Sequence, residues 1–306
     1  MRFPDNSRVC FIGDSLTHAN KALPRIIDFY NKNFEGCGIR FFNCGTAGGT
    51  YKTAIEFFYD DVLRHRPTHA VVAFGVNDAN RWLLGDERSE ERLNRLKASF
   101  EDYKSNVRAY CKMLSENGIS IILCTPAPYD EHTEGEEKPL VGGYALILGY
   151  AQFIREFAME NNIPLCDYHD FIAGALQSDT QPIYSRDRVH PTEHGYYLLA
   201  KCFLAHQGYA IDDERAIPEY FSGWASEVEK MRLIYGAEQM VVRNYRMPLE
   251  DKMSLIEKKV KSEDWGYPVF EQFIRAYAEN KRNQDKLYEK IDELYENDIL
   301  QKEKKI

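Results

Sequence analysis

The chain has 306 residues, of which 44% are hydrophobic and 28% are charged, and its net charge at pH 7 is -9. This composition is typical of a globular protein and excludes a largely disordered chain. The acidic balance argues against nucleic acid or an anionic membrane as the main partner, because neither attracts an acidic surface. No stretch approaches the roughly 18 apolar residues of a membrane span, so we predict none.

The N-terminus and the cysteines both favour a cytoplasmic protein. Residues 1–8 contain no long apolar run of the kind that a secretory signal peptide carries. The seven cysteines are an odd number, and several lie in short apolar segments, where a thiol packs as a small hydrophobic group. We therefore expect reduced cysteines and a cytoplasmic location.

Between Arg8 and Gln207, short apolar runs alternate with longer amphipathic segments, which is the pattern of βα units in a parallel sheet. The apolar runs predict five strands, at 9–12, 39–43, 70–74, 119–124 and 164–167. Helical spacing predicts helices at 21–33, 51–64, 93–117, 143–161 and 193–207. The expected fold is α/β, a three-layer α/β/α sandwich with a five-stranded parallel sheet, in a domain that spans residues 1–208.

After residue 208 the alternation stops, and helical segments rich in aromatic and charged residues follow. They are predicted at 218–235, 249–261, 268–281 and 284–300. We interpret residues 209–306 as a helical C-terminal extension, with the role of a lid, an oligomer contact or a binding module. A homo-oligomer held by these helices is one of the expected arrangements.

The first candidate site follows the first predicted strand, in the sequence Gly13-Asp14-Ser15. A side chain at this point lies at the carboxyl edge of a parallel strand, where open α/β sheets bind their ligands. A serine hydroxyl becomes a nucleophile only when a base lies beside it. The same residues also suit a plain turn or a helix N-cap, so Ser15 needs partners elsewhere in the chain.

The second candidate site is Asp187-Arg188-Val189-His190-Pro191, directly before the last predicted helix of the domain. The three-residue spacing lets Asp187 hold the His190 imidazole in one tautomer while its other nitrogen faces a serine. A Ser-His-Asp triad requires this division of roles. The alternative is that both residues cap the following helix.

Two further candidates follow the second and third predicted strands. Acyl transfer places negative charge on the carbonyl oxygen, so a site needs fixed N–H donors directed at that oxygen. The glycine-rich turn that contains Gly48 exposes backbone N–H groups, and the Asn77 side chain offers an amide. Taken singly, the first also suits a tight left-handed connection, and Asn77-Asp78 suits an Asx turn.

Together and in this chain order, four blocks resemble the SGNH hydrolase superfamily, also called the GDSL esterases and lipases. The blocks are Gly13-Asp14-Ser15-Leu16, Asn43-x-Gly45-x-x-Gly48, Gly75-x-Asn77-Asp78 and Asp187-x-x-His190-Pro191. The resemblance covers about residues 8–207. It implies a carboxylic ester hydrolase in which Ser15 is the nucleophile, His190 the general base and then acid, and Asp187 its orienting carboxylate.

The resemblance also implies an oxyanion hole formed by the backbone N–H groups of Ser15 and Gly48 and the side-chain amide of Asn77. It implies no metal and no organic cofactor. We further expect Asp14 and Asp78, next to two of these residues, to contribute to substrate binding. The helical extension matches no part of the family pattern.

The leading hypothesis is a serine esterase that removes short acyl groups, above all acetyl, from a sugar or another small metabolite. One alternative is a metal-dependent phosphoesterase with Asp14, Asp78, Asp187 and His190 as ligands. Another is a non-catalytic carbohydrate-binding or scaffold protein that uses the aromatic extension. Chelator sensitivity separates the first alternative from the leading hypothesis.

Overall fold

The computed structural model describes residues 2–19, 21–85, 89–132 and 138–211. Five parallel strands form one sheet in the order β2-β1-β3-β4-β5, which confirms the predicted fold class. The strands are β1 (Arg8–Gly13), β2 (Arg40–Gly45), β3 (His69–Ala73), β4 (Ser120–Cys124) and β5 (Leu165–Cys166). The helices predicted beyond residue 211 lie outside the described residues.

The carboxyl ends of the three strands β2, β1 and β3 meet at one edge of the sheet. Gly13, the last residue of β1, is in register with Gly45 on β2 and with Ala73 on β3. Each strand therefore delivers the loop that follows it to the same place. The motifs of Ser15, Gly48 and Asn77 lie at or directly after these strand ends, so the topology alone brings them close together.

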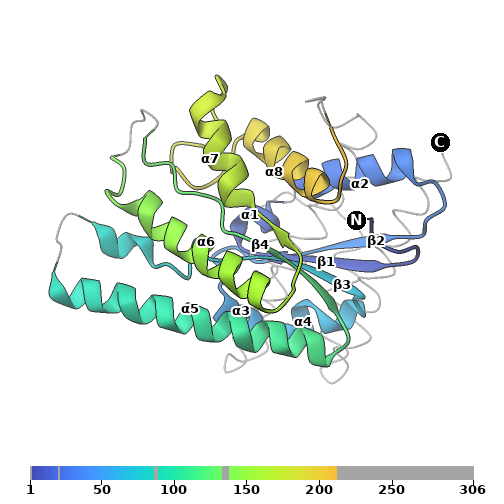
Figure 1. Cartoon of the computed structure of the whole chain (residues 1–306), viewed down its shortest axis with the longest axis horizontal. Helices are drawn as coiled ribbons and strands as arrows, with labels where there is room; N and C mark the ends of the chain where they lie inside the picture. The colour runs from blue at the N-terminus through green and yellow to red at the C-terminus, as the bar shows by residue number, and fades with distance from the viewer. Residues whose placement is uncertain (1, 20, 86–88, 133–137, 212–306) are drawn as a thin grey trace, which may run out of the picture. The chain divides into compact units, whose positions relative to one another are not determined.

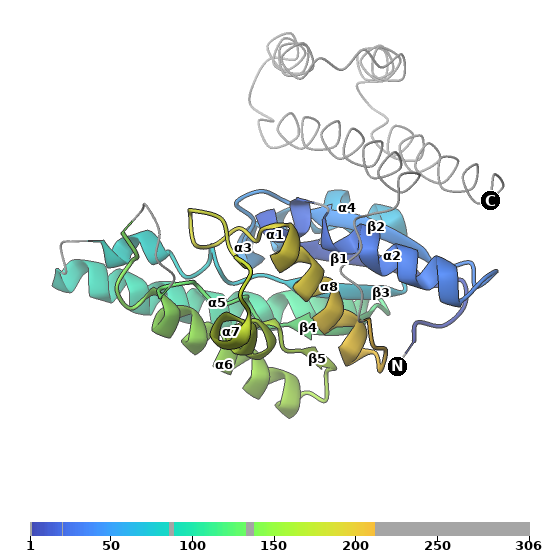
Figure 2. The same cartoon turned by 90° about the horizontal axis from the view of Figure 1, so that it is seen from above.

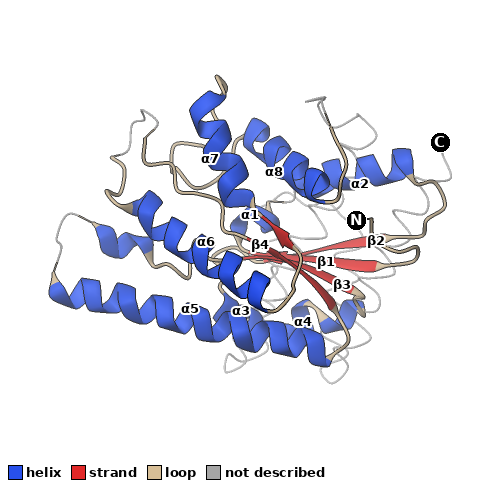
Figure 3. Ribbon diagram, in the orientation of Figure 1, coloured by secondary structure: helices blue, strands red, loops and turns tan. Residues whose placement is uncertain are grey.

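Helices cover both faces of the sheet (Figures 1 and 3). The longer ones are α2 (Ala22–Asn33), α5 (Glu90–Glu116), α6 (Gly143–Glu160), α7 (Tyr168–Ser178) and α8 (Glu193–His206), and the shorter ones are α1 (Ser15–His18), α3 (Tyr51–Glu56) and α4 (Phe58–Asp61). Two 3-10 turns, η1 (Leu63–His65) and η2 (Arg81–Leu84), complete the set in the described residues. Figure 1 shows α2, α7 and α8 on the side of the sheet opposite α3 and α5.

Aromatic side chains fill the core on both faces. On one face the ring centroids of Phe11 on β1 and Phe203 on α8 are 5.1 Å apart. On the other face Tyr103 on α5 lies 5.5 Å from Tyr51 on α3 and 4.6 Å from Tyr150 on α6. Every residue of β1 after Arg8 is buried, as expected for a strand covered by helices on both faces.

Helices α2 and α8 lie side by side in both views (Figures 1 and 2). Tyr30 on α2 donates a hydrogen bond of 2.6 Å to the side chain of Gln207, which follows α8. This contact joins the start of the chain to the end of the domain. No helix in the described part of the chain is long and apolar enough to cross a membrane.

One predicted helix is wrong in its extent. Residues 51–64 form two short helices and part of η1 instead of one helix. The break at Phe57 lets Phe58 turn inward, where its ring lies 5.6 Å from that of Tyr110 on α5. Tertiary packing of this ring overrides the helical spacing of the segment. Helices α1, α7 and η2 were not predicted.

Candidate active site

Ser15 is the first residue of α1, and only Asp14 separates it from the end of β1. The short turn requires a glycine before it, because a Cβ atom at Gly13 would overlap the Thr17 side chain and the carbonyl oxygen of Ala73. Asp14 is the N-cap, and its carboxylate accepts a hydrogen bond of 3.0 Å from the Leu16 N–H. The turn and its cap therefore hold the Ser15 side chain at the sheet edge.

His190 lies in a tight loop that leads into α8. The loop is closed by a bridge between Tyr184 and Pro191 and by a hydrogen bond of 2.8 Å from the Ser185 N–H to the His190 carbonyl. At its tip Arg188 has a φ of 65°, a left-handed conformation that is unusual for a residue with a side chain. Backbone strain of this kind is often found at functional sites.

The Asp187 carboxylate organises this loop. Its Oδ1 atom accepts hydrogen bonds from the Ser185 hydroxyl at 2.9 Å, the Val189 N–H at 3.1 Å and the His190 N–H at 2.9 Å. Its Oδ2 atom bonds the Nδ1 atom of His190. Burial alone would raise the pKa of Asp187, but the hydrogen bonds from His190, Val189 and Ser185 lower it to about 2. Asp187 is therefore ionised at neutral pH.

The other nitrogen of His190 faces Ser15. The His190 Nε2 atom lies 2.7 Å from the Ser15 hydroxyl oxygen, which is hydrogen-bond distance. The structure thus brings together Ser15, His190 and Asp187 in one hydrogen-bonded chain. The side chains of His190 and Asp187 remain 42% and 46% exposed, so a small molecule can reach them from solvent.

The glycine-rich turn after β2 lies next to this chain. The Gly49 N–H donates to the Thr46 carbonyl at 2.9 Å and closes the turn. Gly48, the third residue of this turn, has a φ of 70°, a left-handed value that favours glycine at this position. Asn43 fastens the turn to α1, because its amide donates to the Thr17 carbonyl at 3.0 Å while its oxygen accepts the Gly45 N–H at 3.0 Å.

The Asn77 side chain reaches the same turn from the loop after β3. Its Nδ2 atom donates one hydrogen bond of 3.0 Å to the Gly49 carbonyl. The second hydrogen on that nitrogen is left to donate to another acceptor. The backbone N–H groups of Ser15 and Gly48 bond to none of the described residues. Three N–H donors are therefore available on turns that contact one another beside Ser15.

Asp14 and Asp78 are buried next to two of these site residues, Ser15 and Asn77. The two residues are only 3% and 8% exposed. Asp78 accepts a hydrogen bond of 3.0 Å from the Tyr51 N–H at the start of α3. Burial raises the pKa of Asp14 to about 6 and that of Asp78 to about 7, and each lies near another charge of the site. The observed contacts hold α1 and α3, and the role of these residues in substrate binding stays a prediction.

Arg81 is a charged residue of the site that the sequence analysis missed. Its Nη1 atom donates to the Val76 carbonyl at 3.2 Å. Partial burial lowers the pKa of its guanidinium, while the charges of Tyr129, Asp187 and Asp14 act in the opposite direction. These interactions place Arg81 near two of the expected site residues. Only its position four residues after Asn77 could have drawn attention to it.

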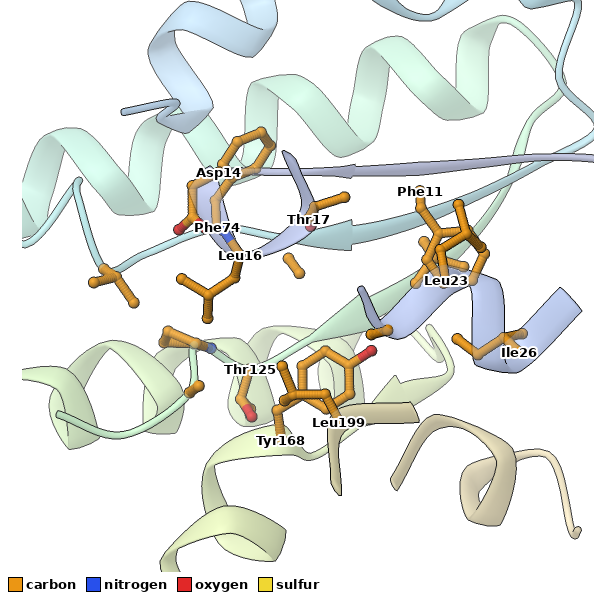
Figure 4. Close-up of a pocket in the computed structure, with 16 residues that line it drawn as sticks. Phe11, Asp14, Leu16, Thr17, Leu23, Ile26, Phe74, Thr125, Tyr168 and Leu199 are labelled. Carbon is orange, nitrogen blue, oxygen red and sulfur yellow. Dashed lines mark hydrogen bonds between the residues drawn. The ribbon is translucent and has the colours of Figure 1, made fainter. Parts of the chain in front are cut away.

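A mostly apolar pocket lies beside the turn that carries Ser15 (Figure 4). Asp14 and Leu16, the residues on either side of Ser15, line one part of it, and Thr125 and Tyr168 line another. Ser15, His190 and Asn77 are not among its lining residues. The pocket therefore adjoins the hydrogen-bonded chain and does not contain it.

In the described part of the chain, no three His, Cys, Asp or Glu side chains are grouped as metal ligands. Asp167 and His169 lie only two positions apart, but their surroundings do not indicate a metal site. The Asp167 carboxylate binds the Arg155 guanidinium through two hydrogen bonds of 2.6 and 2.9 Å. Burial lowers the pKa of His169 to about 4. The pair is part of the packing of α7 against α6.

Comparison with known proteins agrees with this geometry. Residues 11–198 match the GDSL-like Lipase/Acylhydrolase family. An acetylxylan esterase of Geobacillus stearothermophilus is 23% identical over 224 residues, which are 68% of this chain and 97% of that esterase. The crystal structure of Axe2, an acetylxylan esterase from the same organism, is similar with a TM-score of 0.57 at 21% identity, covering 70% of this chain and all of that chain.

A second similar structure is that of a gut microbial diltiazem-metabolizing enzyme, with a TM-score of 0.62 and 24% identity. The match covers 69% of this chain but only 49% of that protein, so the chain spans about half of its length. The fold, the order of the motifs and the family match over most of the domain agree. The protein is a carboxylic ester hydrolase of the GDSL-like lipase/acylhydrolase family.

Proposed function

We propose that the protein is a serine esterase in which Ser15, His190 and Asp187 form the catalytic triad. The observation that carries this proposal is the continuous hydrogen-bonded chain from Asp187 through His190 to Ser15. A serine that lies 2.7 Å from an imidazole nitrogen has the base that it needs for attack on an acyl carbon. An alternative role of Asp187 and His190 as helix caps does not require this contact, and Thr192 caps α8 instead.

The reaction then proceeds in two steps. The Ser15 oxygen attacks the ester carbonyl carbon while its proton passes to His190, and the carbonyl electron pair moves to the oxygen. Collapse of this intermediate releases the alcohol, which takes the proton from His190, and leaves the acyl group on Ser15. Water, deprotonated by His190, attacks the acyl-enzyme in the same way and releases the acid. Asp187 stays ionised and stabilises the imidazolium in both steps.

The N–H groups of Ser15, Gly48 and Asn77 serve as the oxyanion hole. Their availability on neighbouring turns supports this assignment. Such donors accelerate acyl transfer because they are fixed before charge develops on the oxygen. The bond from Asn77 to the Gly49 carbonyl fixes the amide in place, so little reorganisation is needed during the reaction.

We propose a short acyl group, above all acetyl, on a sugar or a similar small molecule as the substrate. The similarity to an acetylxylan esterase over almost the whole length of that protein supports this choice. Structures of Axe2 include catalytic mutants of a serine, an aspartate and a histidine. The last two lie three positions apart in that chain, as Asp187 and His190 do here. No observation favours the phosphoesterase or the non-catalytic alternative.

Labelling with a serine-reactive fluorophosphonate tests the triad. Wild-type protein is expected to take up one phosphonyl group, which intact-mass spectrometry detects and peptide mapping locates on Ser15. Ser15→Ala should take up none, and Ser105→Ala, which removes an exposed serine on α5, should label as the wild type does. Equal labelling of the Ser15→Ala protein contradicts the proposal. Hydrolysis of 4-nitrophenyl esters of two to eight acyl carbons then measures the preference for acetyl.

A further inference from the structure

The turn η2 carries a cation with an unusual environment. Arg81 is half-buried, and its single hydrogen bond to the described residues, from Nη1 to the Val76 carbonyl, occupies one of five N–H groups. Arg81 forms no salt bridge with any described residue, although Asp14 and Asp187 lie close enough to influence it. The hydrogen bond to Val76 therefore holds the guanidinium on the loop that also carries Asn77, with most of its donors available.

The charges around Arg81 indicate what these donors would bind. Asp187 is ionised, and Asp14 carries a growing share of negative charge above pH 6. An anionic ligand would meet both carboxylates, and their repulsion offsets the attraction of a single guanidinium. Neutral oxygen atoms, such as hydroxyl, ring or carbonyl oxygens, accept N–H hydrogen bonds without this repulsion. The environment thus favours a neutral, oxygen-rich ligand.

The next residue on the same turn adds an apolar surface. Trp82 is 54% exposed, which makes it one of the few large hydrophobic side chains of the described residues that face solvent. An indole ring offers a broad face on which the C–H groups of a sugar ring can pack. A pyranose ring has the matching groups, because its oxygen atoms accept hydrogen bonds and its C–H groups form an apolar face.

We propose that Arg81 and Trp82 form the subsite for the alcohol part of the substrate, and that this part is a neutral polyhydroxylated ring. Arg81 donates hydrogen bonds to its oxygen atoms, and Trp82 packs against its C–H face. The subsite determines specificity and takes no part in bond making. The inference rests on the proposed function, because it assumes that Ser15 cleaves an ester whose alcohol lies near η2.

The test compares two acetate esters that share the acyl group and differ in the alcohol. One is a mono-acetylated methyl xylopyranoside and the other is 4-nitrophenyl acetate. For Arg81→Met and Trp82→Ala we expect the ratio of kcat/KM for the sugar ester over that for the aryl ester to fall by about 10- to 100-fold, mainly through KM. Arg81→Lys, which keeps the charge but loses the planar fork, should recover only part of the ratio.

Tyr59→Ala is the matched control, because Tyr59 is also 54% exposed but lies on α4, in the connection that leads back to the start of β3. It should leave both values of kcat/KM unchanged. Melting temperatures of all variants establish that they are folded. If a variant proves unfolded, the wild type is tested instead, by the protection of Ser15 against fluorophosphonate labelling. Weaker protection by free methyl xylopyranoside than by an equal concentration of acetate would overturn the subsite.

Two outcomes separate the subsite from the proposed function. If the wild type cleaves the sugar acetate and both variants keep its ratio of kcat/KM, the subsite is wrong and the esterase proposal stands. Equal losses on both esters likewise overturn the subsite, since they place Arg81 in the shared chemistry or in the support of the Asn77 loop. A wild type that cleaves neither ester, or a Ser15→Ala variant that cleaves both, overturns the proposed function itself.

Discussion

The Nε2 atom of His190 lies 2.7 Å from the Ser15 hydroxyl oxygen, although 175 positions separate the two residues in the chain. Ser15 lies two positions after the end of β1, and His190 comes from the loop that leads into α8. The packing of α8 beside α2, close to the start of the chain, makes this approach possible (Figure 2). The proposed nucleophile and base are therefore held together by the fold of the whole domain.

The first prediction concerns Asp187→Asn. The amide oxygen can still accept the N–H groups of Val189 and His190, so we expect the loop to keep its shape. The amide carries no charge, and its NH2 group toward Nδ1 favours the wrong tautomer of His190. Turnover of 4-nitrophenyl acetate should fall by about 10³- to 10⁴-fold, with a melting temperature close to that of the wild type.

Asp179→Asn is the control for this variant, because Asp179 forms the same type of pair with His194, at 2.6 Å between Oδ2 and Nε2. It removes a carboxylate from a histidine that has no place in the proposed mechanism. Turnover should stay at the wild-type level. A loss below tenfold in Asp187→Asn, or similar losses in both variants, would exclude a special role of Asp187.

The second prediction concerns Asn77→Ala, which removes one proposed oxyanion donor. Acylation should continue but slow down by about 10²- to 10³-fold in turnover, or about 2.7 to 4 kcal/mol, with a smaller change in KM. The bond from Asn77 to the Gly49 carbonyl is also lost, so the melting temperature is measured on the same preparation. A destabilised protein with nearly normal turnover in its folded fraction would make Asn77 a structural residue of the turn.

The sequence predicted the strands and the order of the motifs well, because both depend on local patterns. The buried β1 is an uninterrupted apolar run, and each motif follows a strand end, where the register of parallel strands collects them. The family and the ester hydrolase activity are confirmed. The roles of the site residues, the cytoplasmic location and the role of residues 209–306 stay predictions.

The features that were missed depend on tertiary contacts. Arg81 has no motif of its own, and its relevance comes from the charges of Asp14 and Asp187, which reach it from other loops. The burial of Asp14 and Asp78 could not be read from a pattern, since the same residues suit an exposed turn. Helix α7 is the exception, since its signal is local and was overlooked: Asp167 is a standard N-cap and accepts the Asp170 N–H at 3.1 Å.

The third prediction compares two glycines with the same backbone conformation. Gly48 and Gly36 have φ values of 70° and 73°, and a Cβ atom at either position would meet no other atom within 4 Å. Substitution by alanine should therefore cost both variants about the same stability, roughly 1 to 2 kcal/mol from left-handed strain. Only Gly48→Ala should also lose turnover: alanine keeps the N–H, but relief of the left-handed strain rotates the peptide and redirects this proposed oxyanion donor.

Thermal unfolding and turnover of 4-nitrophenyl acetate check this comparison. Gly36 lies in the turn between α2 and β2, so Gly36→Ala reports the strain alone. If Gly48→Ala retains the turnover of Gly36→Ala at equal stability, the direction of the Gly48 N–H does not depend on the glycine, and the predicted loss of turnover is wrong.

The last prediction concerns the pH dependence of stability and the buried carboxyl of Asp78. Burial raises its pKa from 3.8 to about 7, so between these values the folded protein binds more protons than the unfolded chain. Its contribution to stability is fully present below about pH 3.8 and is lost as the pH rises through about 7. Asp78→Asn has no proton to lose, so the free energy of unfolding should fall less between pH 4 and pH 8 than in the wild type, by up to about 4 kcal/mol.

Urea unfolding of both proteins at several pH values measures this difference. The slope with pH is the informative quantity, because the substitution also changes stability by a constant amount. Asp78 Oδ2 is buried and has no hydrogen-bond partner among the described residues, and an NH2 group in its place would be equally unsatisfied. The amide oxygen still accepts the Tyr51 N–H, so α3 keeps its anchor. Parallel curves for the two proteins would show that Asp78 does not take up a proton on folding, and the buried carboxylate would then be charged at neutral pH.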